Sequence, residues 1–360
     1  MTEMWINMGP QHPMTHGLWN LRVLVDGETI ADAKPEIGYL HRGIEKISEH
    51  RTYDQIIPLC DRLGYASAMT WSHCYCLTVE DLLGIEVPPR AEYIRVVVLE
   101  LQRIASHLMW LAAYTPDLGL LAVFLYALRE RELFLDLLQS VSGNRMEYNY
   151  PRIGGVRNDL PYGFEHQTLK VLDHFEKKLK EYEEMMDDSS IWLIRNQDVG
   201  ILKKSDAIDL GVSGPTLRGS NCKHDTRVHT PYSVYHELDW EPQVEKDCDC
   251  YARYVVRMKE MYESCHIVRQ ALKKMPKGEV RIKAPRHVPA GATFRRTEDS
   301  RGEAMMYLVS DGSDRPYRWK IRSPVFVNVL ASPKFLIGYK VADVPAIMGS
   351  VDLVVGEMDR

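Results

Sequence analysis

The sequence predicts a mainly helical α+β protein, with a central helical bundle and small β-rich pieces at both ends. Three observations support this fold class. Near the N-terminus, apolar residues alternate around Asp26-Gly27, which is the pattern of a β-hairpin. Between about residues 48 and 275, apolar residues recur at helical spacing. From about residue 279 onward, short β-type segments return, with a turn signal at 311–314.

These observations divide the chain into three expected parts. Residues 1–47 form an N-terminal β-hairpin region that includes a loop, residues 48–277 form a helical bundle domain, and residues 278–360 form a C-terminal β-rich extension.

The N-terminal hairpin follows from Leu21, Val23 and Val25, which alternate along one strand before the tight Asp26-Gly27 turn. The preceding loop, residues 9–17, contains two prolines and is flanked by glycines. We therefore expect a constrained loop there that is neither helix nor strand.

The central region is expected to contain four long helices, because four stretches place apolar residues on one side. The first opens at Pro88-Pro89, and the second runs from about Leu120 to Val141. The third covers about residues 169–185 with a charged, solvated face, and the fourth begins near Asp247. Four such helices predict a bundle.

Composition excludes several classes of protein. The chain has 360 residues, of which 45% are hydrophobic and 26% charged, as in an ordinary globular protein with a substantial core. The formal net charge of −5 argues against a general nucleic-acid binder.

No segment is expected to cross a membrane. The most apolar run, Leu118 to Leu128, ends at Arg129-Glu130, well short of a span of about 20 residues. The N-terminus lacks the basic flank and apolar core of a signal peptide. We therefore expect a cytoplasmic protein that could still dock on a membrane protein.

The seven cysteines show no metal-binding pattern. None forms a CxxC pair, and the closest pairs, Cys74 with Cys76 and Cys248 with Cys250, match no common zinc or iron–sulfur spacing. We expect all seven to be reduced thiols that bind no metal. The usual nucleotide, zinc and nucleophile-elbow motifs are also absent from the sequence.

Three other segments are candidates for function. His12 and His16 lie in the constrained loop, where a rigid backbone would fix an imidazole or where the two rings simply hydrogen-bond the loop. Asp117 precedes an apolar run and is either a helix N-cap or a buried acid with a shifted pKa. Residues 39–46 combine charged and apolar side chains, for which a solvated face is the default interpretation.

Taken together, the sequence resembles the D-type subunit, which forms the quinone pocket, of the complex I (NADH:quinone oxidoreductase) family over essentially its whole length. Matching motifs follow one another in the family's order, namely GPQHPxxHG at 9–17, LHRGxEK at 40–46, VPPRA at 87–91, RERE at 129–132, IGGV at 153–156, LRGS at 217–220, VSDG at 309–312, PYR at 316–318 and GEMDR at 356–360. The resemblance implies a peripheral subunit of a membrane-associated, ion-pumping respiratory oxidoreductase, active only within that complex.

The same family is related to the large subunit of NiFe-hydrogenases, which hold nickel and iron with four cysteines. At the corresponding positions this sequence has Gly64, Ser67, Val354 and Glu357. A soft metal site needs thiolates, so the resemblance implies that the chain binds no nickel. The vacated cavity is where the family receives a quinone head group.

The resemblance assigns the pocket to His16, Tyr65 and Asp117. Tyr65 and His16 would donate hydrogen bonds to the two quinone carbonyls and supply the two protons that reduction requires. A carboxylate at Asp117 near His16 would favour the imidazolium, and loss of that charge on reduction would bias a conformational switch.

Electrons would arrive from a 4Fe-4S cluster held by a neighbouring subunit, because this chain has no ligand set for one. The resemblance places Arg42 and Arg62 near that cluster and counts His12 among the cofactor-side residues. Glu147 stands where most members have histidine, so its negative charge would lower the potential of the cluster. The alternative is that Glu147 pairs with an arginine and changes little.

Within the family, the chain looks most similar to the archaeal F(420)H2 dehydrogenase of methanogens, whose acceptor is methanophenazine. This rests on the start of the chain close to the Gly9-Pro10 loop, a short 277–289 region, the unusual 119–124 segment and the cluster of low potential. The alternatives are a component of an NAD(P)H- or ferredoxin-linked quinone oxidoreductase, a hydrogenase-like large subunit and a structural scaffold.

The expected assembly is a hetero-oligomer on the cytoplasmic side of the cell membrane. Its partners would be a B-type iron–sulfur protein, C-type and I-type proteins and an H-type membrane protein of the same complex. The chain itself would bind no cofactor alone, with quinone or methanophenazine as substrate.

Overall fold

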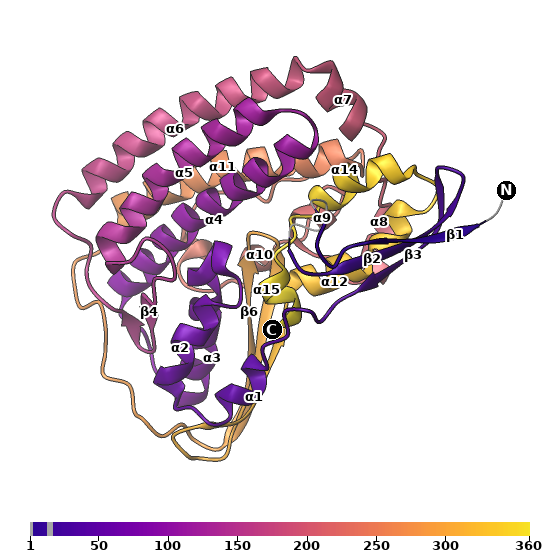
Figure 1. Ribbon diagram of the computed structural model, residues 1–360. Helices are drawn as coiled ribbons and strands as arrows, with labels where there is room; N and C mark the ends of the chain where they lie inside the picture. Colours follow the sequence, from indigo (N-terminus) through magenta and orange to yellow (C-terminus); the bar gives the residue numbers. More distant parts are fainter. Residues whose placement is uncertain (1–2, 13–16) are drawn as a thin grey trace.

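Four long helices lie alongside one another and form the largest part of the protein (Figure 1). The computed structural model describes residues 3–12 and 17–360. The four helices are α4 (Pro89–Asp117), α5 (Leu121–Ser142), α6 (Phe164–Asp187) and α11 (Cys250–Lys274). The predicted bundle is confirmed, and the predicted helix ends are accurate to within a few residues. The fourth helix starts at Cys250 because the Asp249 carboxylate accepts a hydrogen bond from the backbone nitrogen of Ala252 at 2.7 Å.

Helix α4 lies at the centre of the bundle. By length and composition it could cross a membrane, with a mean hydropathy of 1.3 over 18 residues, contrary to the expectation that no segment could. However, 89% of that window is buried inside the protein. A helix that is apolar nearly all round is also what the core of a large domain requires.

Shorter helices connect the bundle to the sheets. Before α4 lie α1 (Ile44–Ser48), α2 (Tyr53–Asp61), the one-turn 3-10 helix η2 (Tyr65–Ser67) and α3 (Ala68–Leu83). A small β4–β5 pair follows α5, and four short helices precede α11: α7 (Ser190–Asn196), α8 (Lys204–Asp209), α9 (Gly214–Arg218) and α10 (Thr226–His229).

The N-terminal hairpin is part of a three-stranded antiparallel sheet. The predicted strands are β2 (Asn20–Asp26) and β3 (Thr29–Glu36), joined at the expected turn. A further strand, β1 (Met4–Met8), pairs with β2 and was not predicted. Leu21, Val23 and Val25 point into the core, as the alternation requires.

The C-terminal region contains a second three-stranded antiparallel sheet and then four helices. The sheet consists of β6 (Gly291–Asp299), β7 (Gly302–Ser310) and β8 (Pro316–Arg322), and the hairpin predicted at 311–314 joins β7 to β8. The chain then forms α12 (Pro324–Leu330), α13 (Ser332–Leu336), α14 (Val344–Gly349) and α15 (Val355–Asp359). The prediction missed these helices, although three of them carry proline in the first turn, where its fixed φ favours a helix start.

The two ends of the chain pack together. One hydrophobic core joins the β1–β3 sheet to the C-terminal helices, and another joins α1–α3 to the β6–β8 sheet. The Asp359 carboxylate accepts hydrogen bonds from the backbone nitrogens of Gly38 at 2.9 Å and Leu40 at 2.8 Å. The last residues therefore lie beside the segment that follows β3.

A buried network of charges joins the bundle to the β6–β8 sheet. Arg218 of α9 is completely buried and donates to Glu260 of α11 at 2.6 Å and to Glu298 of β6 at 2.7 Å. The network continues through Asp225 and Arg227 to Glu100 of α4. Each charge in it is compensated by a neighbour of opposite sign, which is what burial of ions demands.

We expect Arg218→Met to destabilise the fold by about 3–5 kcal/mol, because it leaves Glu260 and Glu298 buried without their guanidinium partner. Urea-induced unfolding measures the loss. The matched control is Lys223→Met, which removes an exposed ion pair to Glu241 and should change stability by less than about 1 kcal/mol. Equal effects of the two substitutions would contradict the importance assigned to the network.

Candidate functional site

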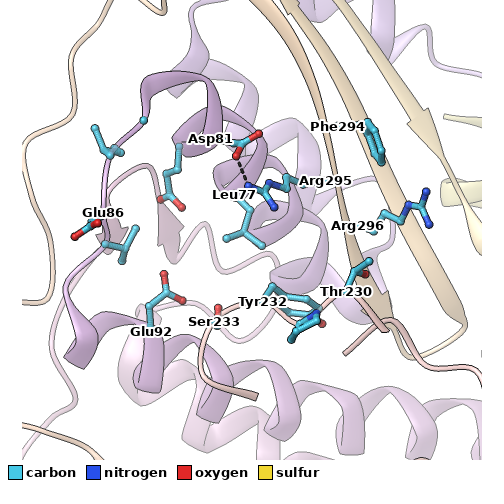
Figure 2. Close-up of a pocket in the computed structure, with 15 residues that line it drawn as sticks. Leu77, Asp81, Glu86, Glu92, Thr230, Tyr232, Ser233, Phe294, Arg295 and Arg296 are labelled. Atoms are coloured by element: carbon cyan, nitrogen blue, oxygen red, sulfur yellow. Dashed lines mark hydrogen bonds and ion pairs between the residues drawn. The ribbon is translucent and has the colours of Figure 1, made fainter. Parts of the chain in front are cut away.

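Two large cavities lie away from the residues singled out by the sequence. One, of about 650 Å³, is bounded by the end of α3, the 84–87 loop, Tyr232-Ser233 and β6 (Figure 2). Another, of about 700 Å³, lies beside residues 281–286. In Figure 2, Arg295 points towards Asp81, with which it forms an ion pair. Neither cavity is lined by a predicted site residue.

A smaller cavity of about 140 Å³ contains Tyr65. One wall comes from η2 and another from α4, with Trp110 and Tyr114. The remaining wall comes from Arg301 and the 349–354 segment. The two segments that the resemblance aligned with the hydrogenase cysteine motifs thus meet at this cavity.

Tyr65 is held in a setting that keeps its phenol protonated. Burial raises the pKa of Tyr65 above its ordinary value, and Glu357 and Asp352 raise it further, while Arg301 and Arg42 counteract the rise. A phenol of this kind releases its proton only to a strongly basic acceptor. Tyr65 is therefore suited to donate a hydrogen bond and, on demand, a proton.

Arg301 is the buried cation of the site. It lies in the turn between β6 and β7, and only 1% of its surface is exposed. Its Nη1 donates to Ser67 Oγ at 3.2 Å, and its Nε forms an ion pair with Asp352 Oδ2 at 3.3 Å. Asp299 is a second partner at 3.5 Å. Although burial lowers it, these carboxylates together with Glu357 raise the pKa of Arg301 above its ordinary value, so the guanidinium stays charged.

Glu357 is a buried acid with few partners. Its side chain is completely buried, and Oε1 accepts a hydrogen bond from Ser323 Oγ at 3.2 Å. Oε2 has no hydrogen-bond partner among the described residues. Burial, followed by the charge of Asp299, raises the pKa of Glu357 well above its usual range.

Gly64 allows Glu357 to lie where it does. A Cβ atom at position 64 would lie 2.7 Å from Glu357 Oε2 and would overlap the indole nitrogen of Trp71. Of the four positions that the resemblance aligned with hydrogenase cysteines, 64 and 357 therefore lie next to each other. Ser67, at the third position, binds Arg301, and Val354, at the fourth, lines the cavity.

Arg42 joins the segment before Tyr65 to the C-terminal helix α15. Its guanidinium donates to the carbonyl of Arg62 at 2.7 Å and to the carbonyl of Gly356 at 2.6 Å. Position 356 is also tightly packed, because a Cβ there would lie 3.0 Å from both the Leu63 carbonyl and Tyr65 Cε1. Arg42 thus fixes the backbone on both sides of the Tyr65 ring.

Arg62 and Glu147 form an ion pair at the surface. The distance from Arg62 Nη2 to Glu147 Oε2 is 2.7 Å, and both side chains are partly exposed, at 47% and 36%. This is the arginine pairing that the sequence left open as the alternative for Glu147. Asp61 lies buried beside them, accepts hydrogen bonds from Ser72 and the Asn149 backbone, and has its pKa raised by burial to about 6.

The remaining predicted residues do not line the Tyr65 cavity in the part of the chain that the structure describes. His16 lies outside the described residues, and His12, the last described residue before that gap, is exposed. Asp117 is exposed and is the last residue of α4, so both interpretations of it, a helix N-cap and a buried acid, were wrong. The chain turns through Leu118–Leu120, with Gly119 at φ +85°, before α5 begins, so Asp117 does not precede a helix directly.

Arg301 and Asp352 are site residues that the sequence did not reveal. Both follow Tyr65 by hundreds of residues along the chain, and only the fold brings them to the same cavity. Within residues 3–12 and 17–360, no group of three or more His, Cys, Asp or Glu side chains has a geometry that could hold a metal ion.

Comparisons with known proteins agree on one family. The family model for the 49 kDa subunit of respiratory-chain NADH dehydrogenase matches residues 117–288 and 281–360. A protein of Dehalococcoides mccartyi strain 195, named as the D subunit of NADH-quinone oxidoreductase, is 48% identical over 363 residues, covering 100% of this chain and 99% of the relative.

Relatives of the same name occur in other bacteria. The protein of Geobacillus kaustophilus is 47% identical over 360 residues, covering 99% of this chain and 98% of its own length. That of Citrifermentans bemidjiense is 44% identical over 384 residues, covering 99% of each chain. The likeness therefore extends over the whole chain.

We expect Gly64→Ala to destabilise the protein by about 1–3 kcal/mol, because the added methyl group must displace Trp71 or Glu357. Thermal unfolding of the purified chain measures the effect. Gly291→Ala is the matched control, since a Cβ there meets only Leu82 at an ordinary 3.5 Å and the backbone needs no left-handed φ. A Gly64→Ala variant as stable as the control would show that the close approach at position 64 is not required.

Proposed function

The chain belongs to the family of the 49 kDa subunit of respiratory-chain NADH dehydrogenase, and we propose that its Tyr65 cavity receives the head group of a quinone. As a member of this family, it is an oxidoreductase subunit in the peripheral arm of the NADH:quinone oxidoreductase complex. In the proposal, neighbouring subunits complete the pocket of which this chain supplies one side.

The observation that carries the proposal is the position of Tyr65. Its phenol lines a cavity formed by η2, α4 and the 349–354 segment, and burial keeps it protonated. A reduced quinone oxygen is a strong base, so it can take a proton that a weaker base would leave on the phenol.

The chemistry needs two electrons and two protons for each quinone. Tyr65 donates a hydrogen bond to one carbonyl and then its proton, and His16 is proposed to do the same at the other carbonyl. Asp117 is proposed to lie near His16 and to favour the imidazolium, and the loss of that charge on reduction is proposed to bias a conformational switch. Electrons are proposed to come from a 4Fe-4S cluster held by a neighbouring B-type iron–sulfur protein.

The Arg42 and Arg62 side of the site is proposed to face that cluster, together with Glu147 and His12. Arg62 and Glu147 carry opposite charges 2.7 Å apart, so their fields at a cluster largely cancel. This favours the alternative in which Glu147 changes the cluster potential little.

The donor and acceptor are proposed to be NADH and a quinone. The relatives named for NADH-quinone oxidoreductase match the whole chain at 44–48% identity. These relatives favour NADH as donor and a quinone as acceptor over F(420)H2 and methanophenazine. No feature of the described residues supports the latter pair. We further propose that this chain binds C-type and I-type partners and an H-type membrane partner. The chain itself is proposed to lie on the cytoplasmic side of the cell membrane.

We expect Tyr65→Phe to lower quinone reduction by the assembled complex by about 10²–10⁴-fold, because the cavity loses its proton donor. NADH oxidation with ferricyanide, which takes electrons before the quinone, should be unchanged. The matched control is Tyr75→Phe in α3, which removes another buried hydroxyl, bonded to the Tyr53 carbonyl at 3.1 Å. Full quinone reduction by the Tyr65→Phe complex would instead support a purely structural scaffold.

The ion pair at the surface allows a second test, by redox titration of the cluster in the intact complex. Glu147→Gln leaves Arg62 unpaired and should raise the midpoint potential, whereas Arg62→Gln leaves Glu147 unpaired and should lower it. The double variant should return close to the parent value, because the pair is removed as a whole. Potentials unaffected by either single substitution would place the cluster elsewhere.

A further inference from the structure

One buried cation, Arg131 of α5, lacks a partner of opposite charge. The residue is 8% exposed, and its side chain forms neither an ion pair nor a hydrogen bond with any described residue. Every other buried Asp, Glu, Lys or Arg side chain within residues 3–12 and 17–360 has at least one such partner. Residues 1–2 and 13–16 include no acid in their sequence that could supply one. Arg131 is therefore an exception in a protein that otherwise compensates its buried charges.

The charged end of Arg131 is open on one side. Its Nε is completely enclosed without a hydrogen-bond partner, whereas the two Nη atoms, which have none either, are not fully enclosed. Burial is the main influence on the pKa of Arg131 and lowers it, and the charge of Glu132 opposes this only in part. A guanidinium that has lost most of its water without gaining an acceptor is unfavourable, so this position favours an added anion.

The acids beside Arg131 on α5 are already engaged with other cations. Glu132 forms an ion pair with Arg145 of the following loop, and both side chains are partly exposed. Glu130 is buried and pairs with Arg129 at 2.7 Å. Neither acid is free to compensate Arg131, and an acid from outside the chain could do so.

The open side of Arg131 adjoins the Arg62–Glu147 surface. The charges of both Arg131 and Asp61 act on the pKa of the Tyr148 phenol, so both lie near this buried ring. Asp61 accepts two hydrogen bonds from other residues, and Glu147 pairs with Arg62 at 2.7 Å. These acids are engaged as well, which leaves the region around Arg131 with one uncompensated positive charge.

We propose that Arg131 binds a carboxylate of the neighbouring iron–sulfur protein, which completes a buried ion pair when the two subunits associate. A guanidinium presents parallel N–H donors whose geometry matches the two oxygens of a carboxylate, so an Asp or Glu side chain of the partner fits this position. The inference rests on the proposed function for the identity of the partner, because the adjoining Arg62–Glu147 surface is proposed to face that protein.

Arg131→Met should have opposite effects on the free chain and on the complex. In the free chain it removes a buried cation without a partner, so the urea midpoint of unfolding should stay or rise. In the intact complex it leaves the partner carboxylate buried and unpaired, so the chain should dissociate faster, on the order of 10²-fold. Exchange of isotopically labelled chain into the complex measures this rate.

The matched control is Lys180→Met on α6. It removes the same charge from a side chain that is 74% exposed and lies 3.9 Å from its partner Glu184. Neither the urea midpoint nor the exchange rate should change appreciably, because exposed ion pairs contribute little.

Arg131→Lys identifies the partner acid by cross-linking in the intact complex. A carbodiimide activates carboxylates and joins them to a neighbouring amine through an amide bond, with the lost oxygen leaving on the urea product. A guanidinium does not react in this way, so the parent complex gives the background. Peptide mass spectrometry should find position 131 joined to an Asp or Glu of the iron–sulfur protein.

Three results would overturn the inference. The first is an Arg131→Met chain that is less stable than the parent when free, which would indicate a partner within the chain. The second is an assembled Arg131→Lys complex without a cross-link from position 131 to the iron–sulfur protein. The third is parental exchange in Arg131→Met combined with phosphate that stabilises the free parent chain alone, which would indicate a small inorganic anion instead.

The proposed function fails by a different measurement. Full quinone reduction by the Tyr65→Phe complex would overturn it even if position 131 cross-links as expected. Loss of quinone reduction in that complex, together with no cross-link at position 131, would overturn the role of Arg131 alone.

Discussion

The arrangement of the site depends on the burial of one guanidinium, that of Arg301. It lies in the tight turn between β6 and β7, and it binds Ser67 from the segment before α3, Asp352 from the segment before α15 and Ser106 from α4. A buried cation must be compensated, so each of these partners is held in place by the same charge. The walls of the Tyr65 cavity come from the same segments, and the charge of Arg301 therefore keeps the cavity together.

Two close approaches of the backbone complete the arrangement. A side chain at Gly64 would overlap Trp71 and Glu357, and one at Gly356 would lie in tight contact with the Tyr65 ring. Arg42 then bonds the carbonyls of Arg62 and Gly356 and prevents the two segments from separating. The buried network around Arg218 likewise joins separate segments through a buried cation, because it connects α9 and α11 to β6. The end of β6 leads directly to Arg301.

The sequence predicted the parts of the fold that depend on local periodicity. Apolar residues at helical spacing predict helices such as α4, and alternating apolar residues around Asp26-Gly27 predict the first hairpin. Each of these signals depends only on residues that lie close together in the sequence. Strand β1 and helices α12–α15 were missed, since such short elements are stabilised mainly by packing on distant segments. Asp117 was misplaced because a cap depends on where the next helix begins, and that was set by the turn through Gly119.

The site was predictable only through a resemblance. Tyr65 and Arg42 came from motifs, but Tyr65 shares its cavity with Arg301 and Arg42 bonds the Gly356 carbonyl. Both pairs join positions hundreds of residues apart, which no spacing rule reaches. The resemblance aligned Gly64, Ser67, Val354 and Glu357 with the hydrogenase cysteines, and none of the four side chains is a thiolate that a soft metal requires. Around these positions lie the Arg301 guanidinium, Asp299 and Asp352, which form ion pairs with it, and the Tyr65 side chain. Only the fold brings these groups to one cavity, because they come from segments that lie hundreds of residues apart in the sequence.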